Sequence, residues 1–142
     1  MKLNSDCVRD TLIYIEEHLQ MNEYNRIKEI SLLSITKGLI DKYEENDIAY
    51  TVFQLIDANF IKGNINTPGR NNKVVANIYD ITWAGHDLLN SIRPQPVWNA
   101  VKQNAANLGI KSIRGLASLA GNIVNAVATN PDVINQIITN IK

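Results

Sequence analysis

The spacing of the apolar residues changes near residue 59, and this change restricts the folds open to the chain more than any other feature. Before it, apolar residues recur at the period of a helix. From residue 60 to residue 82 they are β-branched and recur about every second position. The turn-forming dipeptide Pro68-Gly69 divides this second stretch. The chain is therefore predicted to form helices and then a β-hairpin, with strands over 60–66 and 74–82 and a long polar tip.

Three helices are expected before the hairpin. Asn4 is a good N-cap for the first helix, whose apolar stripe ends at Leu19. Residues 30–33 are short and alternating enough for a single strand, after which Ser34 can cap a second helix. A tight turn then leads to Asp47, which can cap a third helix that ends near residue 58. Two helices joined by a turn of about three residues have the spacing of a helix-turn-helix.

The second strand of the hairpin leads directly into Thr82, which can cap a fourth helix that carries Leu88, Leu89 and Ile92. The resulting order is helix, strand, helix, helix, strand, strand, helix, which is the order of a winged helix-turn-helix domain. We therefore predict an α+β fold with three to four helices and a small antiparallel sheet, in which the hairpin is the wing.

Two prolines, Pro94 and Pro96, mark the end of this domain. After them the composition shifts toward Asn, Ala and small apolar residues. We place the winged helix-turn-helix domain at residues 1–98 and a helical C-terminal tail at residues 99–142.

The tail is predicted to contain two amphipathic helices. Apolar residues from Ile113 to Val127 form one helical stripe, and Asn130-Pro131-Asp132 has the chemistry of a second helix start. Such a tail can pack back on its own domain or form the seam of a homodimer. We predict the homodimer.

Charge is balanced over the whole chain but is distributed unevenly. Residues 1–98 carry 10 basic and 13 acidic side chains, and residues 99–142 carry 4 basic and 1 acidic. Neither part has the dense positive stripe of a protein that grips nucleic acid mainly by charge.

Cys7 is the single cysteine, which excludes an intrachain disulfide and a zinc site built on several thiolates. The sequence does not open with the basic patch and apolar run of a signal peptide. No stretch approaches the roughly 18 apolar residues that a membrane span needs. We therefore expect a cytoplasmic protein that does not contact the membrane.

Double-stranded DNA is the first partner to consider for a winged helix. We expect Tyr50, Thr51 and Gln54 to face outward from the third helix, where they can hydrogen-bond to base edges. Three basic residues of the wing are candidates for phosphate contacts: Lys62, Arg70 and Lys73. The outward face of the third helix carries no Lys or Arg, however, and isolated surface lysines often do no more than solvate a loop. DNA binding is the leading expectation, and a protein-interaction module is the alternative.

Catalysis is not expected. His86 lies beside Asp87, but adjacent residues on a helix point about 100° apart, so a packing role is favoured for His86. Cys7 and His18 share a face of the first helix at a separation of about 16 Å, too far for a nucleophile and its base. The sequence shows no phosphate loop, metal-ligand pair or nucleophile elbow. No catalytic residue, metal or cofactor is predicted.

Three stretches resemble a known family: Met1–Asp10 (MKLNSDCVRD), Tyr14–Glu17 (YIEE) and Ile81–Leu89 (ITWAGHDLL). They are similar to an uncharacterised family of bacteria and their phages, the domain of unknown function DUF2513, over residues 1–98. The resemblance implies a small bacterial or prophage protein and supplies no activity. Leu55–Ile61 also looks like the end of the recognition helix in winged-helix regulators, a likeness of fold only. The expectations are thus a DNA-binding regulator or, alternatively, an antitoxin-like or phage accessory protein that binds another protein.

Overall fold

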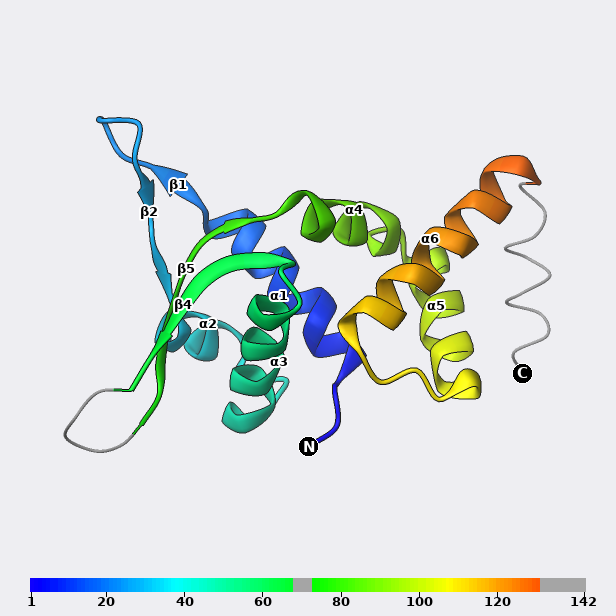
Figure 1. Cartoon of the computed structure of the whole chain (residues 1–142), viewed down its shortest axis with the longest axis horizontal. Helices are drawn as coiled ribbons and strands as arrows, with labels where there is room; N and C mark the ends of the chain where they lie inside the picture. The colour runs from blue at the N-terminus through cyan, green and yellow to red at the C-terminus, as the bar shows by residue number, and fades with distance from the viewer. Residues whose placement is uncertain (68–72, 131–142) are drawn as a thin grey trace. The chain divides into compact units, whose positions relative to one another are not determined.

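The computed structural model describes residues 1–67 and 73–130 (Figure 1). The chain forms two compact units, one over Leu3–His86 and one that begins at Asp87. The units thus divide between His86 and Asp87, whereas the sequence placed the boundary after Trp98. Each unit is described in turn below.

The first unit contains three helices, α1 (Ser5–His18), α2 (Leu32–Leu39) and α3 (Glu45–Asp57), and the start of α4 (Trp83–Ile92). A small sheet formed by β3 (Ile30–Ser31), β4 (Ile61–Asn66) and β5 (Val75–Ile81) completes it (Figure 1). These elements follow one another as the sequence predicted. The α+β class is therefore confirmed, and the arrangement is compatible with a winged-helix-like fold.

The sheet is antiparallel with the strand order β3-β5-β4, so β5 is central. The hairpin pairs Ile61 with Ile81 at its base and Asn66 with Val75 toward its tip, with an irregularity between Lys62 and Gly63. The hairpin predicted as the wing is therefore present, and residues 68–72 of its tip lie outside the described residues.

A second hairpin, which the sequence did not predict, lies between α1 and β3. It consists of β1 (Gln20–Met21) and β2 (Ile27–Lys28) (Figure 1). The side-chain oxygen of Asn22 accepts hydrogen bonds from the backbone of Tyr24 (2.8 Å) and Arg26 (3.1 Å), and Asn25 has a φ of 60°. Two-residue strands are too short to show an alternating pattern, which explains why only the end of a helix was expected there.

The core of the first unit lies where α1, α2 and α3 pack together and against the sheet. The helices contribute side chains with almost no exposed surface: Val8, Leu12, Ile15, Ile35, Ile48, Val52 and Leu55. Ala76 and Ile78 of β5 are also buried, whereas Val75 between the turn and Ala76 is exposed. The sheet therefore buries one of its faces against the helices.

The helix starts were predicted in part. Asn4 caps α1 through a hydrogen bond from the Cys7 backbone (3.1 Å), as predicted. Ser31 rather than Ser34 caps α2, because the Ser31 hydroxyl accepts a hydrogen bond from the backbone N–H of Ser34. Ser31 is also the last residue of β3. The expected cap at Asp47 is also wrong, since α3 already begins at Glu45 and has no side-chain cap.

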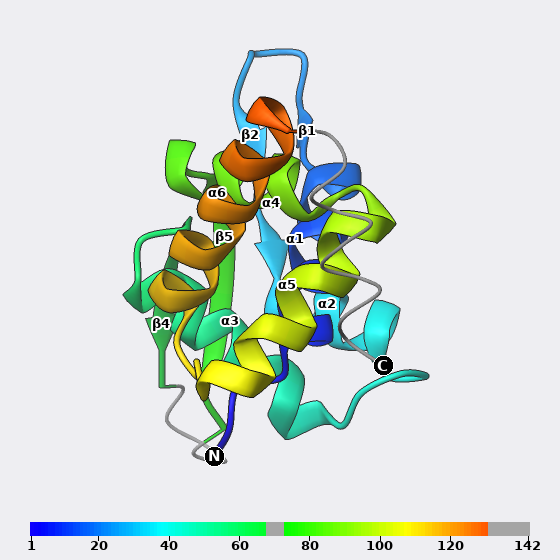
Figure 2. The same ribbon diagram turned by 90° about the vertical axis from the view of Figure 1, so that its right-hand side faces the viewer.

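The second unit contains the rest of α4 and two further helices, α5 (Gln95–Leu108) and α6 (Ile113–Thr129), which pack against each other (Figure 2). Ser112 caps α6 through the Gly115 backbone (3.0 Å), and buried residues lie on the stripe predicted for this helix. The predicted helix after Asn130 lies outside the described residues. Among residues 1–67 and 73–130, none of the helices combines the length and apolar character needed to cross a membrane.

Candidate functional site

The buried stripe of α3 consists of Ile48, Thr51, Val52 and Leu55. Thr51 is only 1% exposed, so the expectation that it faces outward as a DNA-binding residue is wrong. Its hydroxyl donates a hydrogen bond to the backbone carbonyl of Asp47 (2.8 Å), which satisfies the polar group inside the core. The buried stripe of α3 therefore includes Thr51 beside Ile48, Val52 and Leu55.

Two other predicted DNA-binding residues of α3, Tyr50 and Gln54, are half-buried. Asp57 is exposed at the end of the helix, and the first turn carries the carboxylates of Glu45 and Asp47. The accessible part of α3 therefore combines polar hydrogen-bonding groups with negative charge, which repels phosphate.

The predicted basic residues of the wing fall into three different situations. Lys62 is exposed on β4, at the register position opposite Asp80. Lys73 forms an ion pair with Glu45, so the first turn of α3 offsets its charge. Arg70 lies outside the described residues. Of the charges expected to contact DNA from the wing, one is thus already matched by a carboxylate of the same unit.

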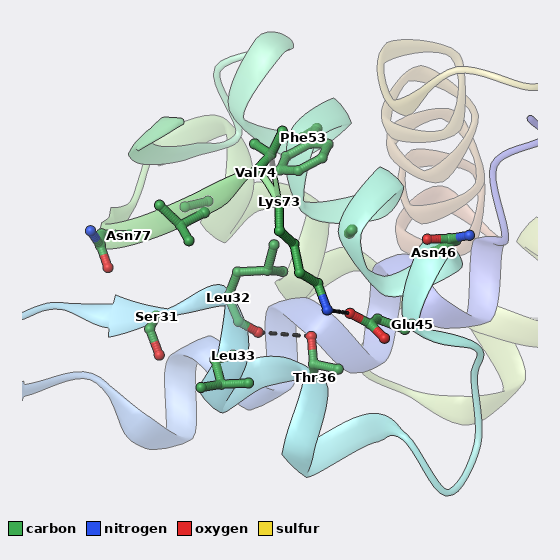
Figure 3. Close-up of a pocket in the computed structure, with 13 residues that line it drawn as sticks. Ser31, Leu32, Leu33, Thr36, Glu45, Asn46, Phe53, Lys73, Val74 and Asn77 are labelled. Atoms are coloured by element: carbon green, nitrogen blue, oxygen red, sulfur yellow. Dashed lines mark hydrogen bonds and ion pairs between the residues drawn. The ribbon is translucent and has the colours of Figure 1, made fainter. Parts of the chain in front are cut away.

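A groove opens between α2, α3 and the start of β5, with a volume of about 890 Å³ (Figure 3). At its rim, the Lys73–Glu45 ion pair joins the segment that precedes β5 to the first turn of α3. The residues that line the groove with apolar surface come from all three elements: Leu32, Leu33, Ala49, Phe53, Val74, Val75 and Ala76. Among the described lining residues only Glu45 and Lys73 carry charge, and these charges are opposite.

Several groove residues are accessible although they are apolar. Leu33 is 63% exposed and Val75 is 43% exposed. The sequence analysis missed this surface because it placed Leu33 in a strand over residues 30–33. One signal was present: neighbours on a helix point about 100° apart, so one residue of the apolar pair Leu32-Leu33 can lie outside the core.

The block Ile81–Leu89 has a structural explanation. The Thr82 hydroxyl donates to the carbonyl oxygens of Asn59 (2.8 Å) and Phe60 (3.0 Å), and it accepts from the Gly85 backbone (3.1 Å). Thr82 therefore caps α4 as predicted and ties the start of α4 to the start of β4. His86 lies edge-on to Trp83, with ring centroids 6.4 Å apart.

The fold raises the pKa of two side chains, Cys7 and Tyr43. Burial is the main cause that raises the pKa of the Cys7 thiol, so the reactive thiolate is disfavoured at neutral pH. Burial and a hydrogen bond to Asp10 (2.6 Å) likewise raise the pKa of Tyr43. No group of three or more metal-ligating side chains occurs within residues 1–67 and 73–130.

Together the fold and its groove define a small α+β protein with the element order of a winged helix-turn-helix and an open apolar groove beside the wing. The chain belongs to the hypothetical protein family DUF2513, whose model matches residues 2–111. The match extends through α5, beyond residue 98, where the resemblance seen in the sequence ends. No curated protein and no solved structure matches the chain.

Proposed function

We propose that the first unit is a protein-interaction module that binds an apolar segment of a partner protein in the groove between α2, α3 and β5. The observation that carries this proposal is the accessible apolar surface of the groove, with Leu33 and Val75 as its most exposed members. A concave apolar surface with few polar groups is typical of binding sites, because a ligand that covers it releases water from apolar area.

Electrostatics favour a protein partner over DNA at this site. The two charged lining residues, Glu45 and Lys73, neutralise each other. Asp47 adds a further carboxylate to the first turn of α3. A nucleic acid would need net positive charge at such a surface, whereas an uncharged apolar segment does not.

The proposal can be tested by selecting a phage-displayed random dodecapeptide library on the full chain. Selected peptides are then measured by fluorescence anisotropy against the wild type, Leu33→Asp and Ile40→Asp. Leu33 and Ile40 are both exposed apolar residues at the two ends of α2, but only Leu33 lines the groove. We expect Leu33→Asp to weaken binding by about tenfold or more, which corresponds to about 1.4 kcal/mol, and Ile40→Asp to leave it unchanged. Failure to select any peptide, or equal binding by both variants, contradicts the proposal.

DNA binding is the second candidate function, favoured by the accessible parts of Tyr50 and Gln54 and by the exposed Lys62. Its test is fluorescence anisotropy with a random-sequence duplex at low salt. Binding at micromolar protein that weakens in Lys62→Ala and with added salt would support it. The absence of binding to the duplex would rule it out.

We also propose that the protein acts in the cytoplasm as a homodimer formed through its C-terminal tail. The single, buried cysteine suits a reducing compartment. Apolar residues of α5 and α6 that retain exposed surface, Leu108, Val124 and Val127, support the dimer. Light scattering of the full chain should give twice the protomer mass of 15.9 kDa. A mass of one protomer would exclude the dimer.

A further inference from the structure

The strand register leaves one part of the sheet without a partner. β3 ends at Ser31, which lies opposite Asn77, and the chain then turns into α2. β5 begins two residues before Asn77, at Val75, and its first residues pair with Asn66 and Ile65 of β4. Among the described residues, Val75 and Ala76 therefore have a strand neighbour on the β4 side only.

The outer edge of β4 and the free part of the β5 edge differ in chemistry. The outer edge of β4 carries Lys62 and the irregularity between Lys62 and Gly63, and both features hinder the addition of another strand. The free part of the β5 edge consists of Val75 and Ala76, and Val74 directly precedes it; all three are uncharged. Lys73 stands next to them, but its ammonium group is directed to Glu45 on α3 (Figure 3).

The groove borders this same edge. Its lining includes Val75 to Asn77 of β5, the preceding residue Val74, and Ser31 and Leu32 at the point where β3 ends and α2 begins (Figure 3). The positions opposite Ala76, Val75 and Val74 span about 10 Å of an extended chain, at about 3.3 Å per residue. On the other side, Phe53 of α3 supplies apolar surface for side chains that point into the groove.

We propose that the partner segment binds as an extended strand antiparallel to β5, beside Val75 and Ala76, on the side where β3 ends at Ser31. This inference rests on the proposed function and specifies its binding mode. Backbone hydrogen bonds to β5 hold the segment, and alternate apolar side chains enter the groove between Leu32 and Phe53. The residues that enter the groove are uncharged, because its two lining charges already neutralise each other and leave no net field to attract a charged partner.

The probe for this mode is the acetylated and amidated hexapeptide Thr-Val-Thr-Val-Thr-Val. Two derivatives keep every side chain and carry N-methyl groups on either the three Thr or the three Val residues. In an added strand only one of these sets can donate hydrogen bonds to β5, since successive backbone groups point to opposite sides. Each lost hydrogen bond is worth about 0.5–1.5 kcal/mol, so the loss of two should weaken binding about fivefold or more.

Binding is followed by NMR on the full ¹⁵N-labelled chain, with Leu33→Asp and Ile40→Asp as the matched pair of variants. We expect the parent peptide to shift the amide signals of Val75 and Ala76, one derivative to lose about fivefold or more in affinity, and the other to keep it. Leu33→Asp should abolish the shifts and Ile40→Asp should preserve them.

Equal binding by both derivatives, equal loss by both, or no binding by the parent peptide overturns the strand mode. The proposed function fails separately, because it depends on dodecapeptides that bind the wild type and are sensitive to Leu33→Asp. If such dodecapeptides are found but the two N-methylated hexapeptides bind equally well, the groove still binds a protein segment. Addition of a strand to β5 is then excluded.

Discussion

A Cβ atom on Gly85 would lie 2.0 Å from the backbone carbonyl oxygen of Phe60. The first turn of α4 and the start of β4 are therefore in backbone contact, and that carbonyl also accepts hydrogen bonds from the backbone (3.1 Å) and hydroxyl (3.0 Å) of Thr82. A side chain at this position would force the two elements apart and break the bonds that close the hairpin onto α4. The block around Thr82 thus holds the wing in place.

Substitution of Gly85 by Ala should accordingly destabilise the protein. We expect a loss of about 3 kcal/mol or more in the free energy of unfolding, because neither backbone segment can move without losing a hydrogen bond. The control is Gly121→Ala in α6, where an added Cβ meets no atom within 4 Å and helix propensity favours Ala. Urea denaturation followed by circular dichroism measures both. A stable Gly85→Ala variant would show that this contact does not fix the junction.

The end of α3 depends on a left-handed residue. Asn59 has a φ of 63°, and the backbone of Phe60 donates to the Leu55 carbonyl (2.9 Å) while that of Asn59 donates to Ile56 (3.0 Å). This pattern is a Schellman motif, and Gly is its preferred residue. Asn59→Gly should change the free energy of unfolding by less than about 0.5 kcal/mol, whereas Asn59→Ala should lower it by about 1 kcal/mol. Equal stability of the two variants would contradict the role assigned to this conformation.

Local chemistry explains which parts of the fold could be predicted from sequence. Asn4 and Thr82 cap their helices as predicted, because each directly precedes a stretch with helical apolar periodicity. Ser31 and Ser34 are both possible caps, and the choice between them depends on where β3 stops, which is a property of the sheet. The apolar periodicity of α3 indicated a helix but could not show that Thr51 occupies a core position.

The groove was beyond prediction for a similar reason. It borders the part of β5 that β3 does not cover, because β3 ends opposite Asn77 while β5 extends to Val75. Where each of these strands ends depends on pairing between segments that are far apart in sequence. The ion pair between Lys73 and Glu45 likewise depends on how the wing lies against α3. The sequence alone predicted that Lys73 could contact phosphate. Its ion pair with Glu45 follows from the tertiary structure.

Tyr43 should make stability depend on alkaline pH. Its hydroxyl donates to Asp10, and burial raises its pKa above the ordinary value of 10.0. Because the folded state holds this proton more tightly than the unfolded state, the contribution of Tyr43 is complete below pH 10 and is lost as the pH rises further. Tyr43→Phe should cost about 1 kcal/mol at pH 8, and the difference from the wild type should shrink above pH 10. Urea denaturation of both proteins across this range is the measurement, and a constant difference would refute the linkage.

The Lys73–Glu45 ion pair should contribute little to stability. Its side chains are 67% and 51% exposed, so water and salt screen their attraction. A double-mutant cycle with Lys73→Ala and Glu45→Ala should give a coupling energy below about 1 kcal/mol that falls further at high salt.

The same variants separate the candidate functions, because loss of Lys73 removes positive charge from the wing but leaves the apolar lining intact. We expect Lys73→Ala to keep the affinity for selected dodecapeptides within about twofold, a change of about 0.4 kcal/mol. A loss of duplex binding in Lys73→Ala, with peptide binding absent in the wild type, would instead favour the DNA-binding function.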